Sequence, residues 1–266
     1  MKNQEQWAMP LDEFIVYSPE LGNYAEQLLI GRCLQEAGRS WPVPWQNTDF
    51  PTRKDQNRVG NRIFNEFTAA AWGYHYAPNA DEVSVQLWWE FGDATDPAVA
   101  DPAFMRDFDA CSDKVRSTDI SLNWLRDVDS WNYVNGLASQ AADIVEQDDE
   151  VRRAVARWHE CLSGRVDFAV PSDVRQMPTQ EVSQRFGLTG PEASVTASAE
   201  EIAVAVADAE CRTSSGLAEL RYDREWEEQQ KLLDANRDQL ERIRAEAKAH
   251  HRVLLESIAA NAPGAP

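Results

Sequence analysis

RCLQEAGRSWPVPW, at residues 32–45, places a cysteine five residues before a glycine and follows the glycine with an extended run that contains two prolines. HECLSGRVDFAVPSD, at residues 159–173, repeats the order of cysteine, glycine and proline. Glycine commonly ends a helix, and a proline after it prevents the helix from resuming. The two stretches therefore predict two equivalent helices, each with a cysteine near its end.

Both predicted helices have readable starts and apolar faces. The first begins with Ser18 as N-cap and Pro19 in the first helical position, and the second begins near Asp148. Apolar residues at helical spacing lead up to each cysteine. They are Leu21, Ala25, Leu28 and Leu29 before Cys33, and Val151, Val155 and Trp158 before Cys161.

Cys111 and Cys211 also occupy matching positions, late in helices with strong start signals. DPAFMRDFDACSDKVR, at 101–116, has Asp101 as a cap ahead of a proline. SAEEIAVAVADAEC, at 198–211, pairs Ser198 with Glu201 in a capping box. A cysteine helix, a connector and a second cysteine helix therefore occur twice in the chain.

Four cysteines allow three disulfide connectivities, and the duplicated order favours Cys33–Cys111 and Cys161–Cys211. Each bridge would stabilise the fold by roughly 2–4 kcal/mol, and both would imply an oxidising, extracytoplasmic setting. The alternative is four free, buried thiols in a cytosolic protein. No pair has the Cys-x-x-Cys spacing of a zinc or redox site.

The predicted fold class is all-α: an irregular helical domain with a duplicated two-helix disulfide unit, long loops and a long C-terminal helix. We expect four segments, at 1–117, 118–147, 148–216 and 217–260, packed as one compact domain. Further helices are expected at 61–73, at 81–91 and at 120–146, the last interrupted near Asn135 and Gly136. Residues 165–197, rich in Pro, Ser, Thr and Gly, are expected to form a loop.

The C-terminal helix is expected to run about forty residues from Gly216, because the sequence from 217 to 260 contains neither proline nor glycine. Its heptad seam runs through Tyr222, Trp226, Gln229, Leu233, Asn236, Leu240, Ile243, Ala247, His250 and Leu254. One interpretation is a helix packed along its own domain. The others are a coiled-coil homodimer through 217–260 or a partner-binding arm.

Composition excludes several classes of protein. The 266 residues carry a formal charge of −19, with 45 acidic and 26 basic residues, which argues against nucleic acid as a partner. No apolar run approaches the roughly 18 residues of a membrane span. MKNQEQWAMPLDEF, at 1–14, lacks the pattern of a signal peptide, so a targeting segment or lipid anchor is expected upstream.

No sequence motif predicts catalysis, a metal or a cofactor. The four histidines form no metal-binding spacing: His75 is expected to be packed among aromatic residues, and His159 lies two residues from Cys161 and on another face of the helix. No nucleophile elbow or phosphate-binding loop is present. Carboxylates brought together by the fold, as in glycosidases, stay open as an alternative.

Tryptophan is the remaining functional signal. The candidate ligand-binding residues are Trp41, Trp45, Trp72, Tyr74, Trp88 and Trp89, which crowd the loop-rich region between 39 and 100. Rigid aromatic side chains on loops are good anchors for sugars, peptides or proteins. The alternative is that they fill the core of a region with little regular structure.

Several motifs together resemble a known family. They are Cys-Leu followed by Gly and the proline run, WNYVNGLASQAAD at 131–143, ARWHECL at 156–162 and EIAVAVADAECRTSSGL at 201–217. The chain resembles a family of actinobacterial secreted or lipid-anchored proteins of uncharacterised activity, over roughly residues 15–260. The resemblance implies a lipoprotein-like, cell-surface setting and a helical architecture, and it does not supply an activity. The chain departs from the family pattern after Cys161, where the spacing to glycine shortens to CLSG.

The sequence thus predicts an extracytoplasmic, non-catalytic binding protein whose ligand is a peptide, a cell-wall component or another protein. The first alternative is a secreted, carboxylate-dependent hydrolase of cell-wall material. The second is a coiled-coil scaffold that acts through 217–260.

Overall fold

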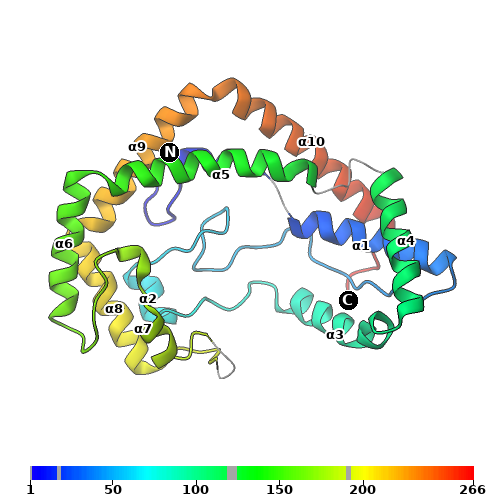
Figure 1. The fold of residues 1–266 in the computed structure, drawn as a ribbon, viewed down its shortest axis with the longest axis horizontal. Helices are drawn as coiled ribbons and strands as arrows, with labels where there is room; N and C mark the ends of the chain where they lie inside the picture. The colour runs from blue at the N-terminus through cyan, green and yellow to red at the C-terminus, as the bar shows by residue number, and fades with distance from the viewer. Residues whose placement is uncertain (1, 17–18, 119–124, 190–192) are drawn as a thin grey trace. The chain divides into compact units, whose positions relative to one another are not determined.

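The computed structural model describes residues 2–16, 19–118, 125–189 and 193–266, and these form α-helices with no β-strand (Figure 1). The all-α prediction is confirmed. The helices of this described part are η1 (Pro10–Phe14), α1 (Pro19–Glu36), α2 (Glu66–Trp72), α3 (Glu82–Val99), α4 (Pro102–Thr118), α5 (Leu125–Glu146), α6 (Asp149–Ser163), η3 (Val174–Gln176), α7 (Gln180–Arg185), α8 (Ala199–Ser214), α9 (Leu217–Ala235) and α10 (Arg237–Asn261).

The chain divides into two compact units, each assembled from three separate segments. Unit 1 comprises Met1–Asp12, Thr52–Pro78 and Gly136–Asn236, and unit 2 comprises Glu13–Pro51, Asn79–Asn135 and Arg237–Pro266. Each unit contains one disulfide.

Both predicted disulfides are confirmed. Cys33 on α1 pairs with Cys111 on α4 in unit 2, and Cys161 on α6 pairs with Cys211 on α8 in unit 1. The Cα atoms are 5.7 Å apart in each pair, which is the usual separation for a bridge. The repeated order of helices in the sequence therefore corresponds to two cross-linked helix pairs.

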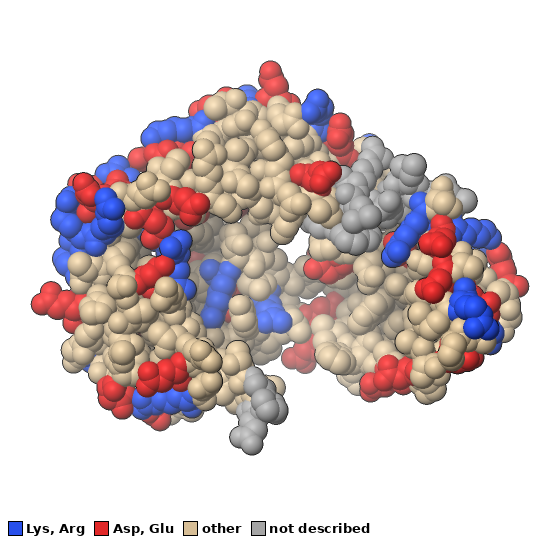
Figure 2. Space-filling view, in the orientation of Figure 1, with Lys and Arg blue, Asp and Glu red and all other residues tan. Residues whose placement is uncertain are grey.

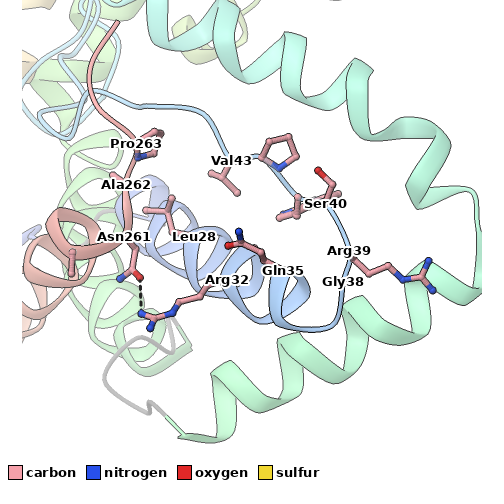
Figure 3. A pocket seen from close by; sticks show the side chains of 14 residues that line it. Leu28, Arg32, Gln35, Gly38, Arg39, Ser40, Val43, Asn261, Ala262 and Pro263 are labelled. Atoms are coloured by element: carbon pink, nitrogen blue, oxygen red, sulfur yellow. Dashed lines mark hydrogen bonds between the residues drawn. The ribbon is translucent and has the colours of Figure 1, made fainter.

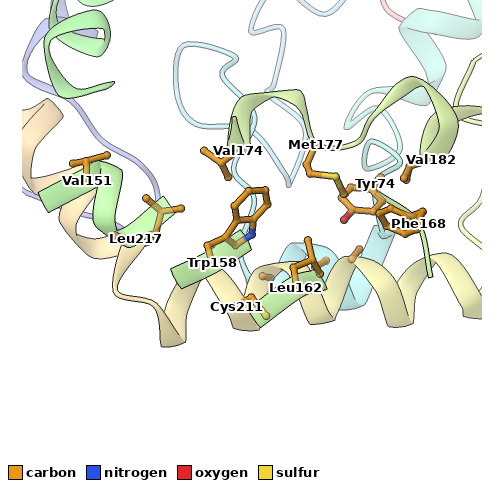
Figure 4. Close-up of a cluster of buried hydrophobic side chains, with 14 of the residues drawn as sticks. Tyr74, Val151, Trp158, Leu162, Phe168, Val174, Met177, Val182, Cys211 and Leu217 are labelled. Atoms are coloured by element: carbon orange, nitrogen blue, oxygen red, sulfur yellow. The ribbon is translucent and has the colours of Figure 1, made fainter. Parts of the chain in front are cut away.

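Unit 1 has a large apolar core between α2, α6, α8 and α9. Trp158 of α6 is fully buried there, and Figure 4 shows side chains of α6, α8 and the 168–182 segment converging around it. Asp148 caps the N-terminus of α6, as predicted, by accepting hydrogen bonds from Glu150 N and Val151 N. The apolar stripe predicted for 148–164 is the face that α6 buries.

Asp208 connects several elements inside this core. The buried carboxylate accepts hydrogen bonds from Trp158 Nε1 at 2.8 Å, from the Tyr74 hydroxyl at 3.1 Å and from the Arg212 guanidinium at 2.8 Å. Buried charges are tolerated when they are paired and hydrogen-bonded, and Asp208 meets both conditions. Burial is the main cause that raises the pKa of Tyr74, and the Asp208 charge is the next. The phenol therefore stays protonated and donates a hydrogen bond to the carboxylate.

Glu201 performs only half of its predicted capping role. Its N–H donates to Ser198 Oγ at 3.1 Å, so Ser198 is the N-cap of α8 as expected. The carboxylate instead accepts from Tyr74 N at 2.7 Å and lies 2.8 Å from His75 Nδ1. A Cβ on Gly73 would lie 2.6 Å from the Glu201 carboxylate, so glycine is what allows this close approach.

Unit 2 is built on α1, which packs against α4 and α10, and on α3, which packs against α4. Trp41 is central to it. The indole contacts Phe91 edge-on, with ring centroids 5.0 Å apart, and contacts Phe108 at 5.2 Å. Trp41 Nε1 donates to Gln27 Oε1 at 2.9 Å. Apolar clusters on both sides of α1 share this indole.

The predicted interruption of the helix at 120–146 is wrong. α5 continues through Asn135 and Gly136 to Glu146, because a glycine inside a helix costs only about 1 kcal/mol and nothing crowds this one. The expected start of this helix at Ile120 and the expected N-cap Ser18 lie outside the described residues.

The predicted long C-terminal helix is confirmed as α10, but its predicted start at Gly216 is wrong, because a break at Asn236 separates α9 from α10. Asn236 Nδ2 donates to the carbonyl oxygen of Leu232 at 2.8 Å, and Asn236 N contacts both Leu232 O and Leu233 O. Asparagine side chains compete with the helical backbone in this way. Absence of proline and glycine therefore did not guarantee continuity.

Most seam residues of α9 and α10 are buried within the chain itself. They are Tyr222, Gln229, Leu233, Leu240, Ile243, Ala247, His250 and Leu254. α9 packs against α6 and α8, and α10 packs against α1. This is the first of the interpretations of the seam, and the coiled-coil homodimer stays a prediction.

Two further boundaries differ from the sequence predictions. The segment 165–197, expected as loop, contains η3 and α7, because Asp173 and Thr179 act as N-caps. The helix expected at 81–91 starts after Asp81 as predicted and extends to Val99. No described helix combines the length and apolar character that crossing a membrane requires.

Candidate binding groove

The structure divides the predicted aromatic ligand-binding residues between the two units. Trp72 and Tyr74 belong to unit 1, and Trp41, Trp45, Trp88 and Trp89 belong to unit 2. Tyr74 is only 3% exposed, and its hydroxyl is bound to Asp208, so it is a core residue here. The six residues therefore do not share one surface within either unit.

The four candidate tryptophans of unit 2 differ in exposure. Trp41, Trp45 and Trp88 are half-buried, and Trp88 packs on Phe91 with centroids 5.4 Å apart. Trp89 is 71% exposed. Of the four, Trp41 lines a groove. One of the predicted ligand-binding residues therefore belongs to the candidate site.

This groove lies between α1, the extended segment after it and the end of α10 (Figure 3). It has a volume of about 860 Å³ and is open to solvent. Leu28 and Val43 give it an apolar floor, and Trp41 is the one aromatic residue in its lining. The polar lining comes from Arg32, Gln35 and Arg39, with Ser40 on the extended segment and Asn261 at the end of α10.

A glycine on α1 determines how closely the extended segment approaches the helix. The carbonyl oxygen of Trp41 lies 2.9 Å from the position that a Cβ on Gly31 would occupy. Any side chain there would push the Trp41 backbone away from α1. Gly31 therefore fixes the width of the groove at the position of the indole.

The charge of the groove is opposite to that of the chain. No Asp or Glu lines it, although the chain carries 45 of them, and two of its lining residues are arginines. Figure 2 shows acidic and basic side chains interspersed on the visible face. Many arginines outside the groove are paired, as in the Arg185–Asp167 ion pair at 2.6 Å. Interspersed charges largely cancel, whereas the groove retains positive charge.

The two arginines of the groove are not equivalent. Arg39 Nε donates to Asp107 Oδ2 at 2.8 Å, and Figure 3 shows its guanidinium directed away from Arg32. Arg32 is exposed and contacts the amide oxygen of Asn261 at 3.4 Å; it has no carboxylate partner among the described residues. Arg32 is therefore the positive charge available to a ligand.

The lining also indicates which chemistry the groove supports. It contains no carboxylate, histidine or cysteine, so it offers no side chain suited to general acid–base or thiol catalysis at neutral pH. It does offer a guanidinium, two amides, a hydroxyl and an apolar floor, which is the combination of a recognition site.

Carboxylates with raised pKa values occur elsewhere. Burial raises the pKa of Asp12, and burial with the nearby Asp12 charge raises that of Glu225. Asp12 accepts from Met9 N at 2.9 Å, and Glu225 accepts from Gln229 Nε2 at 3.2 Å. Both groups lie in unit 1, outside the groove, and their contacts hold the N-terminal segment and α9. Among the described residues, no group of three or more His, Cys, Asp or Glu side chains is placed to hold a metal ion.

Comparisons with protein-family models, with curated proteins and with solved structures give no significant match. The resemblance to actinobacterial secreted proteins therefore stays a prediction, and the site is defined by its geometry. Sequence reasoning missed Arg32, Gln35, Ser40 and Asn261 as site residues. No sequence signal joins Arg32 to Asn261, because 229 positions separate them.

Proposed function

We propose that the chain is an extracytoplasmic, non-catalytic binding protein whose unit 2 groove receives a ligand with a carboxylate group, such as the carboxyl end of a peptide. The observation that carries the proposal is an exposed arginine with no carboxylate partner in the described part of the chain, in a groove whose lining has no acidic residue, on a chain of charge −19.

The ligand class follows from the lining. A guanidinium binds a carboxylate through two parallel hydrogen bonds, which gives both strength and direction. Gln35 and Ser40 offer further hydrogen-bonding groups, and Leu28 and Val43 offer an apolar surface for small side chains. A short peptide end presents the same combination: a terminal carboxylate, amide groups and side chains.

The proposed compartment is supported by the cysteines. All four form disulfides within the chain, and such bonds are typical of proteins outside the reducing cytosol. Peptides with free carboxyl ends, including those of cell-wall material, are available in that setting.

Affinity selection with peptide pools tests this proposal. One pool contains N-acetylated tripeptides with free carboxyl ends, and the other contains the same tripeptides as amides. We expect the protein to retain members of the acid pool and not their amides, with the retained peptides identified by mass spectrometry.

Two variants assign retention to the groove. Arg32→Gln removes the free guanidinium and should abolish retention. Arg106→Gln, which removes an exposed arginine of α4 in the same unit but outside the groove, should leave it unchanged. Equal retention of acids and amides, or undiminished retention by Arg32→Gln, would refute the proposal.

A further inference from the structure

Asn261, the last residue of α10, makes the one hydrogen bond that links the end of that helix to Arg32 across the groove (Figure 3). Its Nδ2 donates to Ser257 O at 2.7 Å, which fixes the amide with its oxygen toward the guanidinium. The Arg32 Nη1 to Asn261 Oδ1 distance is 3.4 Å, which is long for a hydrogen bond. The contact is therefore defined in direction and weak in strength.

A ligand carboxylate would form a stronger bond with the same guanidinium. Hydrogen bonds between two charged groups are shorter and roughly twice as strong as those with a neutral acceptor. An amide oxygen at 3.4 Å on an exposed arginine offers little to offset that difference. A carboxylate that binds Arg32 through the same Nη1 group should displace Asn261.

The chain after Asn261 is held lightly. Ala262 packs against the apolar cluster of α1 and α10, and its N–H donates to Ile258 O at 2.7 Å. Pro263 lines the groove, and the residues from 263 to 266 are exposed. Two prolines and a glycine prevent 263–266 from extending the helix. Apart from the contact of Asn261 with Arg32 at its base, the tail is therefore attached mainly through Ala262.

We infer that Asn261 is an internal competitor for Arg32: it occupies the guanidinium in the free protein, sets the affinity of the groove for carboxylates and couples ligand binding to release of the 262–266 tail. This inference rests on the proposed function, because it assigns to the same groove a residue that limits its affinity.

Two substitutions at one position should have opposite effects. Asn261→Ala removes the competitor, so affinity should rise about twofold to fivefold, the range that a weak hydrogen bond sets. Asn261→Asp places a carboxylate against Arg32, so affinity should fall at least about tenfold. Loss of structure alone would lower affinity in both. Ala259→Asp adds the same charge to an exposed position of α10 outside the groove and should change affinity less than about twofold.

Calorimetric titration with the best-retained acetylated tripeptide acid measures these changes. In an Arg32→Gln background, neither substitution of Asn261 should alter the residual affinity, because the pair is already broken. If the wild-type protein binds through Arg32 but both substitutions change affinity less than about twofold, the inference is overturned and the proposed function stands.

A second readout requires no ligand. The ¹⁵N heteronuclear NOE of Gly264 and Ala265 reports the mobility of the tail. Relative to the wild type, it should be lower in Arg32→Gln and higher in Asn261→Asp. Identical values in all three proteins would overturn the inference whether or not a peptide binds. Absence of peptide binding would overturn the proposed function and, with it, the role of Asn261 as a competitor.

Discussion

The two units use polar side chains in opposite ways. In unit 1, Asp208 is fully buried, and both of its carboxylate oxygens accept hydrogen bonds, from Trp158, Tyr74 and Arg212. In unit 2, Arg32 and Asn261 line an open groove and share one long contact. Groups that are satisfied internally have nothing left for a ligand, whereas lightly bonded groups at a groove do.

The comparison teaches where to look for function in a chain without recognisable motifs. The most elaborate hydrogen-bonded cluster, around Asp208, is explained by the fold, because it joins α6, α8 and the 72–76 segment. The simpler groove is not explained by the fold, because an exposed arginine without an acidic partner contributes little to stability. The residues with fewest internal partners are therefore the better functional candidates.

The largest expected effect is in unit 1. Asp208→Ala removes the acceptor of Trp158, Tyr74 and Arg212 and leaves the Arg212 charge without its partner. We expect a loss of roughly 3–5 kcal/mol in the free energy of unfolding. Hydrogen–deuterium exchange with peptide resolution should show faster exchange in α6 and α8, with α1 and α4 much less affected.

The matched control in unit 2 is Arg32→Ala, which should change stability by no more than about 0.5 kcal/mol. A loss of several kcal/mol there, or a small loss in Asp208→Ala, would contradict the division into structural and functional polar groups.

The two disulfides should contribute nearly equally to the free energy of unfolding, one in each unit. Replacing both cysteines of either pair by alanine should cost roughly 2–4 kcal/mol. The sequence separations are 78 and 50 residues, and loop entropy alone makes the 33–111 bridge only about 0.4 kcal/mol more stabilising. Urea denaturation of the two double variants measures the difference. A difference of several kcal/mol between the double variants would show that the stability of one unit depends on its disulfide far more than that of the other.

Gly31→Ala separates the stability of unit 2 from its proposed function. Alanine raises helix propensity by about 1 kcal/mol, and the clash with the Trp41 carbonyl costs about 1–3 kcal/mol, so stability should fall slightly. Retention of tripeptide acids should fall, because the extended segment moves. Gly92→Ala on α3, where a Cβ meets nothing within 4 Å, should gain about 1 kcal/mol and keep retention unchanged.

The smallest effect concerns pH and belongs to unit 1. The pKa values of Asp12 and Glu225 are raised on folding, so the folded state binds their protons more tightly than the unfolded chain does. Stability attributable to these groups is therefore present below their ordinary values of 3.8 and 4.5 and is lost as pH rises through the higher folded values. Glu225→Gln should stabilise the protein on the order of 0.5 kcal/mol at pH 7.5 and not at pH 4. Thermal unfolding at the two pH values tests this, and equal shifts at both would contradict it.

Much of the fold was predictable because its signals are local. Caps at Asp148 and Ser198, the apolar stripes and the cysteine positions determine helices and their pairing without knowledge of distant contacts. The errors in the predicted helix ends and caps arose where a side chain made a contact that the residue type alone does not predict. Asn236 bonded back to its own helix, and Glu201 turned away from its cap to Tyr74.

The candidate site was predictable only through Trp41. The indole lies close in sequence to Gly31 and Arg32, so the region between 31 and 45 was marked by its tryptophans and prolines. Asn261 comes from the other end of the chain and joins the groove only because α10 packs against α1. Composition also concealed the groove, since a chain with a large negative charge gives no sign of a local excess of arginine.

The pairing of the cysteines has a consequence for how the chain matures. Synthesis delivers them in the order 33, 111, 161 and 211, and each native bond joins a cysteine to the next one made. If the chain is oxidised during synthesis, each disulfide can therefore form as soon as the second of its two cysteines has been made. No cysteine has to wait until after a non-native candidate has been synthesised. Formation of the native disulfides during synthesis should therefore need little help from an isomerase.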